Sequence, residues 1–249
     1  MDIQTEWVTI DVNGSPMKAY LAKPTSGGPH PGVVVFMEIF GINEHIQDVT
    51  RRIAAEGYVA IAPNFYHRQA ADLNLGYTPE AIEEGRKYKM EVSHKGLLAD
   101  ARATIAYLQG LATCASQDKL ASIGFCFGGY VAYVVATLPE IAVTASFYGT
   151  GLPHQTAGKE EAPTDLTSQI KGYVFCGFGE QDSSIPPADI QAVKQALAKA
   201  HVPHKIIVYP GADHGFFCDR RASYNPQAAL EAWQEIKHLF ALHLKGATV

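Results

Sequence analysis

Short runs of apolar residues recur along the chain, and most of them lack a polar face. They are rich in Val, Ile, Tyr and Phe, and they cover residues 33–37, 58–62, 120–125, 142–148, 172–176 and 205–209. A half-exposed strand alternates apolar and polar residues, whereas a continuous apolar run indicates a strand buried on both faces. The pattern therefore predicts a mostly parallel sheet that is covered by helices.

Segments with a 3.6-residue period lie between these runs. Ile46, Val49 and Ile53 share one helical face, and we expect this helix to end at Gly57, because glycine is favoured just beyond the last turn. Further apolar faces are predicted at Leu98, Ala101, Ile105 and Leu108; at Ile190, Val193 and Leu197 after Pro186 and Pro187; and at Leu230, Trp233, Leu239, Phe240 and Leu244 after Asn225 and Pro226. Alternating strands and helices favour one doubly wound α/β domain over residues 1–249.

Two segments depart from this alternation. Residues 8–12 and 17–22 flank Asn13-Gly14, a pair that favours the turn of a hairpin, so we expect an antiparallel ribbon at the N-terminus. Residues 63–93 mix Tyr, Arg, Lys and Gly and are longer than a normal connection between strand and helix. We interpret them as an irregular partial cap over a functional site.

Composition and charge narrow the function classes. The 249 residues are 47% hydrophobic and 18% charged, which excludes disordered, collagen-like and coiled-coil chains. The formal net charge of −5 and the absence of basic runs argue against nucleic-acid and anionic-membrane partners. No apolar stretch reaches about 18 residues, and residues 1–9 carry Asp2 and Glu6 where a signal peptide would be basic and then apolar. We therefore expect a soluble cytoplasmic protein.

The four cysteines are too sparse for a disulfide framework or a structural zinc site. Cys114, Cys126, Cys176 and Cys218 form no Cys-x-x-Cys pair, so each is expected to be a free thiol. His201, His204 and His214 are close in sequence, but the first two precede a predicted strand and the third follows it. They should lie at opposite ends of that strand, and we expect no metal site and no cofactor.

The sharpest chemical motif is Gly124-Phe125-Cys126-Phe127-Gly128, at the end of an apolar run and before a helical segment. This is the Gly-x-nucleophile-x-Gly spacing of a strand-to-helix elbow, with cysteine in place of the usual serine. A thiolate at the first turn of a helix is stabilised by the helix dipole, and the Phe127 N–H would face a developing oxyanion. The alternative is a buried structural cysteine, which is common.

Two later motifs supply the partners that such a nucleophile needs. Asp182 follows the run 172–176, and His214 follows the run 205–209, so both are expected at the carboxyl ends of strands. His214 would accept the thiol proton, and the acid would fix its tautomer. Asp213 and Glu180 compete with Asp182 for the acid role. Taken separately, Asp182 is also compatible with a helix cap, and His214 with a surface turn.

Ordered motifs along the chain resemble those of a known family. They are Glu38-Ile39-Phe40-Gly41, the elbow at Cys126, the Gly-x-x-Asp that ends at Asp182, and the His-Gly-Phe that begins at His214, together with Ala62-Pro63-Asn64-Phe65-Tyr66 and Phe147-Tyr148-Gly149. They are similar to those of the dienelactone hydrolases (carboxymethylenebutenolidases) of the α/β-hydrolase superfamily over nearly the whole chain. The resemblance implies a single α/β-hydrolase domain, a Cys126-His214-Asp182 triad, and an oxyanion hole formed by the main-chain N–H groups of Ile39 and Phe127.

The resemblance also gives Glu38 a catalytic role. In the relatives this glutamate holds the resting thiol by a hydrogen bond until substrate binds, and a carboxylate near a thiol favours its protonated form. We add the hypothesis that this protects the sulfur from oxidation, because the thiolate is the species that oxidises. Without the resemblance, Glu38 would be interpreted as an exposed loop carboxylate.

Substrate contacts are less sharply indicated. The relatives anchor a substrate carboxylate with cationic side chains from the cap and from just after the catalytic histidine, and arginine suits such bidentate binding. The residue four after His214 is Cys218, and Arg221 and Arg86 are the candidates for this role; solvated surface arginines are the alternative for both.

We therefore expect a hydrolase that needs no cofactor and cleaves a small lactone or carboxylic ester through a thioester at Cys126. Its partner would be a small molecule, and it would be a monomer or a small homo-oligomer. One alternative is a general carboxylesterase or thioesterase with the same machinery. Another is a binding or redox-sensing protein without catalysis. A sensor usually has a resolving thiol nearby, whereas Cys114 precedes the elbow strand and is expected at the end far from Cys126, which argues against this alternative.

Overall fold

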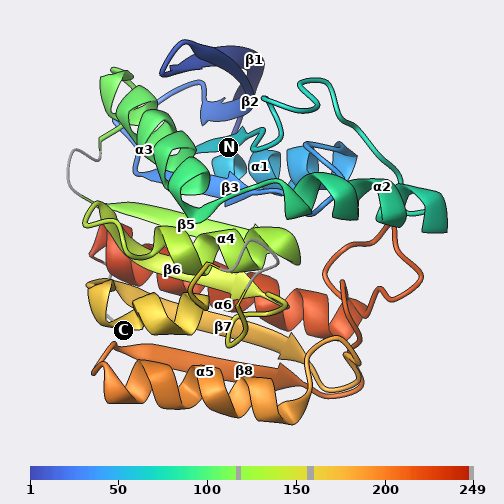
Figure 1. Ribbon diagram of the computed structural model, residues 1–249. Helices are drawn as coiled ribbons and strands as arrows, with labels where there is room; N and C mark the ends of the chain where they lie inside the picture. Colours follow the sequence, from blue (N-terminus) through green and yellow to red (C-terminus); the bar gives the residue numbers. More distant parts are fainter. Residues whose placement is uncertain (116–118, 156–159, 247–249) are drawn as a thin grey trace.

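The computed structural model describes residues 1–115, 119–155 and 160–246. Within these residues the strands form one eight-stranded sheet in the order β1-β2-β4-β3-β5-β6-β7-β8 (Figure 1). The strands are β1 Ile3–Val12, β2 Ser15–Pro24, β3 Gly32–Phe36, β4 Val59–Pro63, β5 Leu120–Phe125, β6 Ile141–Phe147, β7 Tyr173–Gly179 and β8 His204–Tyr209. The six strands from β3 onward run parallel, and β2 is antiparallel to both β1 and β4. The predicted α/β sheet is confirmed.

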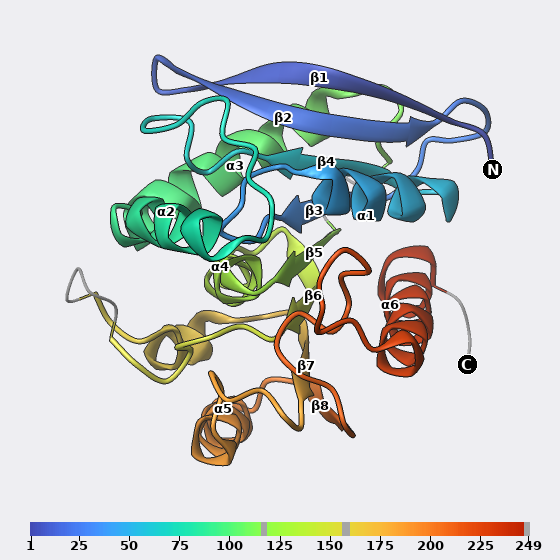
Figure 2. The same cartoon turned by 90° about the vertical axis from the view of Figure 1, so that its right-hand side faces the viewer.

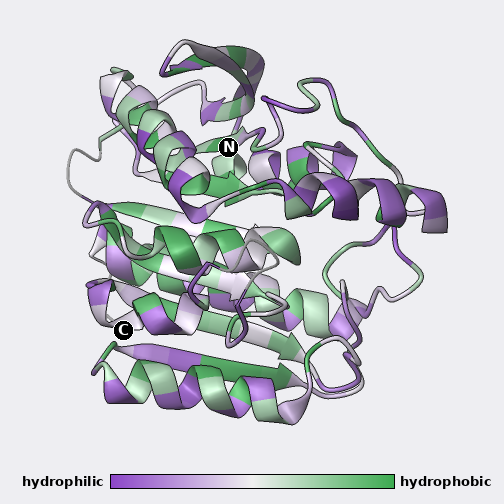
Figure 3. Ribbon diagram, viewed as in Figure 1, coloured by the Kyte–Doolittle hydropathy of each residue, from purple (hydrophilic) through white to green (hydrophobic). Residues whose placement is uncertain are grey.

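Helices cover both faces of this sheet. They are α1 Glu44–Ala55, α2 Pro79–Met90, α3 His94–Gly110, α4 Phe127–Val135, α5 Pro187–Lys199 and α6 Pro226–Lys245, with a 3₁₀ helix at Pro163–Gln169. In Figure 2, α1 and α6 lie on one side of the sheet, and α3, α4 and α5 lie on the other. In the hydropathy colouring of Figure 3, β3 and α4 are largely green, whereas much of α2 and the first half of β8, at the edge of the sheet, are purple.

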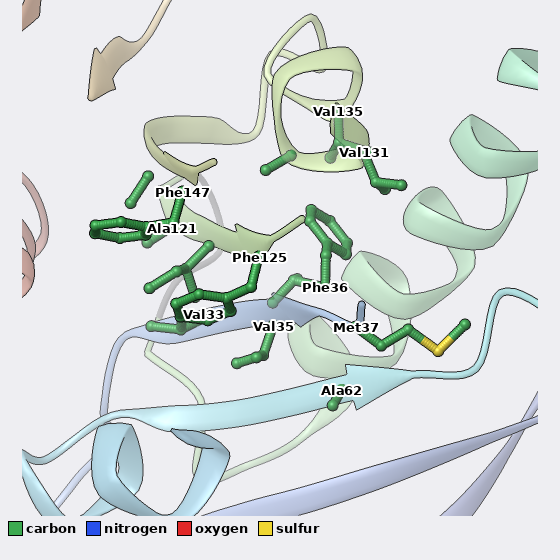
Figure 4. Close-up of a cluster of buried hydrophobic side chains, with 14 of the residues drawn as sticks. Val33, Val35, Phe36, Met37, Ala62, Ala121, Phe125, Val131, Val135 and Phe147 are labelled. Atoms are coloured by element: carbon green, nitrogen blue, oxygen red, sulfur yellow. The ribbon is translucent and has the colours of Figure 1, made fainter. Parts of the chain in front are cut away.

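The core forms where β3, β5 and α4 meet. All residues of β3 and β5 are buried, so these strands carry apolar side chains on both faces. Figure 4 shows Val33, Val35 and Phe36 of β3 in one cluster with Phe125 of β5 and Val131 of α4. Because close-packed interiors deform little, this cluster gives the loops at the carboxyl ends of the strands a rigid base.

The N-terminal ribbon is confirmed and is longer than the sequence pattern predicted. Its two strands pair from Ile3 opposite Pro24 to Val12 opposite Ser15, around the turn at Asn13-Gly14. Asn13 has φ 54° and Gly14 has φ 85°, as this kind of turn requires. The outer strand β1 is mostly exposed, and its buried residues lie near its C-terminal end. This explains why the apolar pattern predicted only that end of the strand.

The cap prediction was partly wrong. Within residues 63–93 the structure has helix α2, which the sequence analysis treated as irregular. Only Ala81 and Gly85 of this helix are buried, so it lacks the apolar stripe that reveals most helices. Its N-terminus nonetheless carries clear signals, since Thr78 caps the Ala81 N–H and Pro79 occupies the first turn.

Two predicted helix faces are confirmed at most positions and differ at one leucine each. In α3 the buried leucine near the start is Leu97, whereas Leu98 is only partly buried. In α6 Leu239 and Phe240 are buried as predicted, whereas Leu230 is 56% exposed and the first turns pack through alanines, Ala228, Ala229 and Ala232. Within the described residues, no helix combines the length and apolar character that crossing a bilayer would require.

Candidate active site

The strand order places a crevice at the carboxyl ends of β3 and β5. The connection from β3 leads to β4 on one side, whereas β5 and the later strands lie on the other. Parallel sheets bind ligands at such a reversal point, because the two diverging connections leave a gap. Phe36 pairs with Gly124, so Glu38 and Cys126, each two residues further on, leave neighbouring strands at the same level.

Cys126 occupies a strained elbow between β5 and α4. Its φ of 55° and ψ of −116° are rare for a residue with a side chain, and such strain persists where the surrounding structure enforces it. The elbow is tight, since a Cβ on Gly124 would overlap the Gly128 carbonyl and one on Gly128 would overlap the Phe36 carbonyl. The two glycines therefore let the helix start directly against the strands, with Cys126 at its N-cap.

Asp182 and His214 come together across the ends of β7 and β8. Asp182 Oδ2 lies 2.7 Å from His214 Nδ1, and the Asp182 side chain is fully buried. The other oxygen, Oδ1, accepts a hydrogen bond of 2.9 Å from the Ser184 N–H, which fixes the carboxylate. Cys126 and His214 line the same cleft, and the cysteine is close enough to influence the pKa of the imidazole. The three predicted residues are thus arranged in the order sulfur, imidazole, carboxylate.

The two competing acids have other partners. Asp213 Oδ1 accepts the backbone N–H of His214 at 2.6 Å, and Glu180 Oε2 accepts the Gly211 N–H at 2.8 Å. Both carboxylates therefore hold the loop that carries His214, whereas Asp182 holds its ring. The geometry distinguishes the acids where sequence order alone had left them open.

The environment of His214 favours its charged form. Burial alone would lower the pKa of the imidazole, but the neighbouring Cys126 and the hydrogen bond with Asp182 outweigh burial and raise the pKa to about 10. A proton leaving the thiol is therefore well accommodated on this ring. The surroundings therefore stabilise positive charge on the His214 ring.

Tyr148 supports His214 and was missing from the predicted site. Its ring meets the imidazole edge to face, with centroids 5.2 Å apart and an interplanar angle of 66°. It is fully buried and has a φ of 36°, directly after β6. A non-glycine residue at positive φ after a strand is a feature of functional sites, but φ is not readable from the sequence.

Glu38 is fully buried, so its interpretation as an exposed loop residue is excluded. Among the described residues, its carboxylate has hydrogen bonds with Arg221 Nη1 at 3.0 Å and with the Tyr77 hydroxyl at 3.2 Å. A buried carboxylate without a partner would be very costly, and the guanidinium offsets that cost. The resemblance had implied a bond to the resting thiol, whereas these two contacts tie Glu38 to a cationic wall and to the cap.

Tyr77 connects this ion pair to the residues behind it. Burial and the Glu38 charge both raise the pKa of its hydroxyl, so it stays protonated and donates to Glu38. It accepts from Asn43 Nδ2 at 3.1 Å and from the Cys218 thiol at 3.2 Å. Burial, and secondarily Glu38, raise the pKa of Cys218 to about 11, which keeps that thiol protonated. Cys218 therefore serves as a hydrogen-bond donor to Tyr77 in the cleft wall. Tyr77 is a second residue of the site that the sequence analysis missed.

Cys126 opens into a cleft of about 710 Å³, which we call the active-site cleft. Its walls include Ile39, Tyr77 and Ile82 on one part, Asp213 and His214 on another, and four cationic side chains, Arg86, Lys89, Arg220 and Arg221. Cys126 itself is 9% exposed, so the sulfur is largely enclosed but accessible from the cleft. The cations outnumber the acids facing the cleft, which suits a negatively charged ligand.

Both predicted arginines line the active-site cleft, in different settings. The Arg221 side chain is only 16% exposed and is held against Glu38. The Arg86 side chain is 67% exposed, on α2, and lies 3.9 Å from Glu83. Arg221 is thus held in place before a ligand binds. Arg86 is a long, exposed side chain at the rim of the cleft, and solvent weakens its ion pair with Glu83.

The predicted oxyanion-hole residues flank the sulfur. Ile39 follows Glu38 after β3 and lines the active-site cleft, and Phe127 is the first residue of α4. Helix α2 lies against Ile39, because a Cβ on Gly85 would overlap the Ile39 carbonyl oxygen. The first N–H groups of a helix lack partners within the helix and carry the positive end of its dipole, so α4 favours negative charge beside Cys126.

One grouping in the described residues has the composition of a metal site. Glu38, His45 and Cys218 offer ligand atoms within 4.8 Å of one another, and all three are buried. The Arg221 guanidinium and the Tyr77 hydroxyl already occupy the Glu38 oxygens, which disfavours a cation there. His204 begins β8 and His214 follows its end, as expected, so these two do not share a site.

All four cysteines are buried, and none of them is part of a disulfide. Cys114 precedes β5 and forms an isolated backbone β-bridge with His30, whereas Cys126 follows the carboxyl end of β5. A resolving partner for Cys126 would have to be within disulfide distance, with Cα atoms less than about 7 Å apart. The length of β5 separates Cys114 from Cys126, which argues against a redox pair.

Comparisons with known proteins find relatives over nearly the whole chain. Residues 17–244 match the model of the dienelactone hydrolase family. A relative from Synechocystis sp. with a provisional carboxymethylenebutenolidase name is 52% identical over 245 residues, covering 98% of this chain and 99% of its own. One from Escherichia coli strain K12, with the same provisional name, is 34% identical and covers 94% of this chain and 85% of its own.

A solved structure gives the same result for the fold. The crystal structure of a provisionally named dienelactone hydrolase from Klebsiella pneumoniae is 33% identical, superposes with a TM-score of 0.88, and covers 97% of this chain and 99% of its own. Fold, motif order and relatives therefore agree, and the chain is a hydrolase that belongs to the dienelactone hydrolase family.

Proposed function

We propose that this hydrolase cleaves small lactones or esters that carry a carboxylate, through a thioester formed on Cys126. The observation that carries the proposal is the chain of contacts from Cys126 through His214 to Asp182 at the floor of a cation-lined cleft. A nucleophile, a base and an orienting acid in this order are the parts that acyl transfer requires.

In the first half-reaction His214 takes the proton from the Cys126 thiol, and the sulfur attacks the substrate carbonyl carbon. The main-chain N–H groups of Ile39 and Phe127 stabilise the resulting oxyanion. When the tetrahedral intermediate collapses, the carbon–oxygen ester bond breaks, and the imidazolium returns its proton to the leaving alkoxide. A lactone opens in this step, and its hydroxyl stays attached to the acyl group.

In the second half-reaction water attacks the thioester carbon while His214 accepts a proton from that water. The carbon–sulfur bond then breaks, the proton passes to the sulfur, and the carboxylic acid leaves. Asp182 stabilises the imidazolium in both halves, since its carboxylate stays 2.7 Å from Nδ1. The high pKa of His214, about 10, supports a charged intermediate of this kind.

The substrate carboxylate would bind Arg221. This guanidinium lines the active-site cleft and is held on its other side by Glu38, so it is oriented before substrate arrives. A substrate carboxylate that engages Arg221 competes with Glu38 for the same cation. We infer that substrate binding weakens the Glu38–Arg221 ion pair. The Glu38 carboxylate is then less neutralised, and its electrostatic effect on the Cys126 sulfur increases.

The test is to trap the acyl-enzyme. Mass spectrometry of enzyme quenched during turnover of a carboxylate-bearing lactone or activated ester should reveal an adduct on Cys126. Cys126→Ala should lose both the adduct and turnover, while Cys218→Ala, which removes another buried thiol beside the cleft, should keep both. Full turnover by Cys126→Ala would refute the proposal. Equal kcat/KM for charged and neutral esters of equal reactivity would favour a general carboxylesterase.

A further inference from the structure

A second cavity adjoins the active-site cleft, and we call it the side pocket. It has a volume of about 170 Å³ and lies between the end of α2, the starts of α3 and α4, and the loop after β6. Its walls include Lys89, Val92, Leu97, Phe127, Tyr130 and Thr150. Lys89 and Thr150 also line the active-site cleft, and Phe127 follows the nucleophile directly. The side pocket therefore borders the reacting centre.

Two polar side chains of the side pocket, Tyr130 and His154, have partners outside it. The Tyr130 hydroxyl lies 2.6 Å from His94 Nε2, and His154 Nε2 lies 2.8 Å from Asp189. The Lys89 ammonium lies over the Phe127 ring, 5.7 Å from its centroid. What these residues present to the cavity is aromatic faces and hydrocarbon, together with the side chains of Val92 and Leu97. This contrasts with the active-site cleft, which is lined by arginines.

We propose that the side pocket binds an apolar arm of the substrate, so that the enzyme acts on amphiphilic esters or lactones. Their carboxylate would lie in the cationic cleft, and an alkyl or aryl group would lie among Val92, Leu97 and Phe127. This inference rests on the proposed function and adds the chemical class of the substrate to it. At about 30 Å³ for each water-sized group, the cavity of about 170 Å³ has room for an arm of roughly five or six carbons.

The expected selectivity follows from burial of apolar surface. Each methylene that moves from water into the side pocket should raise kcat/KM by about fourfold, until the cavity is full. Two series of substrates test this: p-nitrophenyl esters of increasing acyl length, and alkyl esters of one acid with increasing alcohol length. In at least one series we expect kcat/KM to rise with chain length and then to level off when the chain fills the side pocket.

Filling the pocket should remove this preference. Val92→Trp should lower kcat/KM for the preferred long ester by at least about tenfold and leave that for the shortest ester within about twofold. Met90→Trp serves as a second variant, because Met90 also lines the pocket but is 58% exposed and tolerates a larger side chain without disturbing the core. Glu91→Trp is the matched control, since Glu91 is exposed and lies between these two residues without lining the pocket.

The outcomes separate the two proposals. A flat response to chain length in both series overturns the side-pocket inference, and so does an equal loss for short and long esters in both tryptophan variants. An equal effect of Glu91→Trp would also overturn it. Inactivity of Cys126→Ala combined with any of these results leaves the thioester mechanism standing. Full activity of Cys126→Ala would refute that mechanism, while the chain-length profile would still report on the side pocket.

Discussion

The Arg221 guanidinium donates to the Glu38 carboxylate at 3.0 Å, although the two residues are 183 positions apart in the chain. Glu38 follows β3, and Arg221 lies in the loop after β8, so the pair joins two parts of the cleft wall. Glu38 is fully buried and Arg221 is mostly buried. This ion pair therefore acts on both stability and substrate binding, and the two roles can be separated.

Removing Arg221 should destabilise the protein. Arg221→Gln leaves the buried Glu38 charge with Tyr77 as its remaining partner, and loss of one member of a buried pair costs up to about 3–5 kcal/mol. Urea denaturation should reveal this loss. The double variant Glu38→Gln with Arg221→Gln should recover most of it, because no buried charge is left unpaired. If the double variant is no more stable than the single one, the ion pair is not the source of the loss.

Arg221 should also determine selectivity for a carboxylate. In the stable double variant, kcat/KM for a carboxylate-bearing ester should fall by about 10- to 100-fold more than that for a neutral ester, as expected for a lost charged hydrogen bond. Arg86→Gln is the comparison, because its side chain is 67% exposed and should contribute less than about threefold. An equal effect on charged and neutral esters in the double variant would remove Arg221 from substrate binding.

Asp182 and Asp213 offer a matched pair for the acid role. Asp182→Asn should lower kcat by about 10³- to 10⁴-fold, because an amide cannot stabilise the imidazolium and favours the wrong tautomer. Asp213→Asn should lower it by less than about tenfold, since Asp213 accepts the His214 backbone N–H and does not touch its ring. Steady-state kinetics, with circular dichroism to check folding, decides between them. The reverse ranking would assign the acid to Asp213.

The sequence predicted the parallel strands well because their burial on both faces leaves continuous apolar runs, as in β5. It predicted the faces of α3 and α6 less well. In α6 Leu239 and Phe240 are buried as expected, but in the first turns alanines are buried, while Leu230 points to solvent. Small residues carry little hydrophobic signal, although they allow a helix to approach a sheet closely. Helix α2 was missed because it covers a polar cleft and so has almost no buried apolar face.

The residues of the proposed triad could be located in the sequence because each stands in a local motif. Cys126 needs the elbow glycines, and Asp182 and His214 each follow a strand. The surroundings could not be predicted in the same way. Glu38 and Arg221 are paired only by the three-dimensional fold, and Tyr77 reaches them from the cap. Such long-range contacts leave no periodicity or spacing in the chain.

The close packing of the elbow can be tested with glycine substitutions. A Cβ on Gly124 would overlap the Gly128 backbone, so Gly124→Ala should force the helix away from the strand and remove Cys126 from its position. We expect a loss of at least about 1–3 kcal/mol in stability and a large loss of turnover. Gly110→Ala is the control, because a Cβ there meets no atom within 4 Å, at the end of α3, and should be neutral or slightly stabilising. Thermal unfolding and kcat/KM of the two variants should differ accordingly.

His45 should make the protein less stable in acid. Burial, only partly opposed by the charges of Glu38, Asp219 and Asp48, lowers the pKa of this imidazole below 6.5. Its ring packs edge to face against Phe125 and Phe217, and Nε2 is buried without a hydrogen-bond partner. Below about pH 6.5 the unfolded chain therefore binds a proton at His45 that the folded chain does not bind, so the free energy of unfolding must fall as the pH is lowered.

The size of this effect is bounded at about 1.4 kcal/mol per pH unit, because one proton is involved. Urea denaturation at about pH 5 and about pH 7.5 should give a smaller difference in unfolding free energy for His45→Phe than for the unsubstituted protein. His201→Asn is the control, since His201 is exposed and its φ of 55° suits asparagine, and it should keep the original difference. If His45→Phe has the same pH dependence as the unsubstituted protein, protonation of His45 does not drive the acid destabilisation.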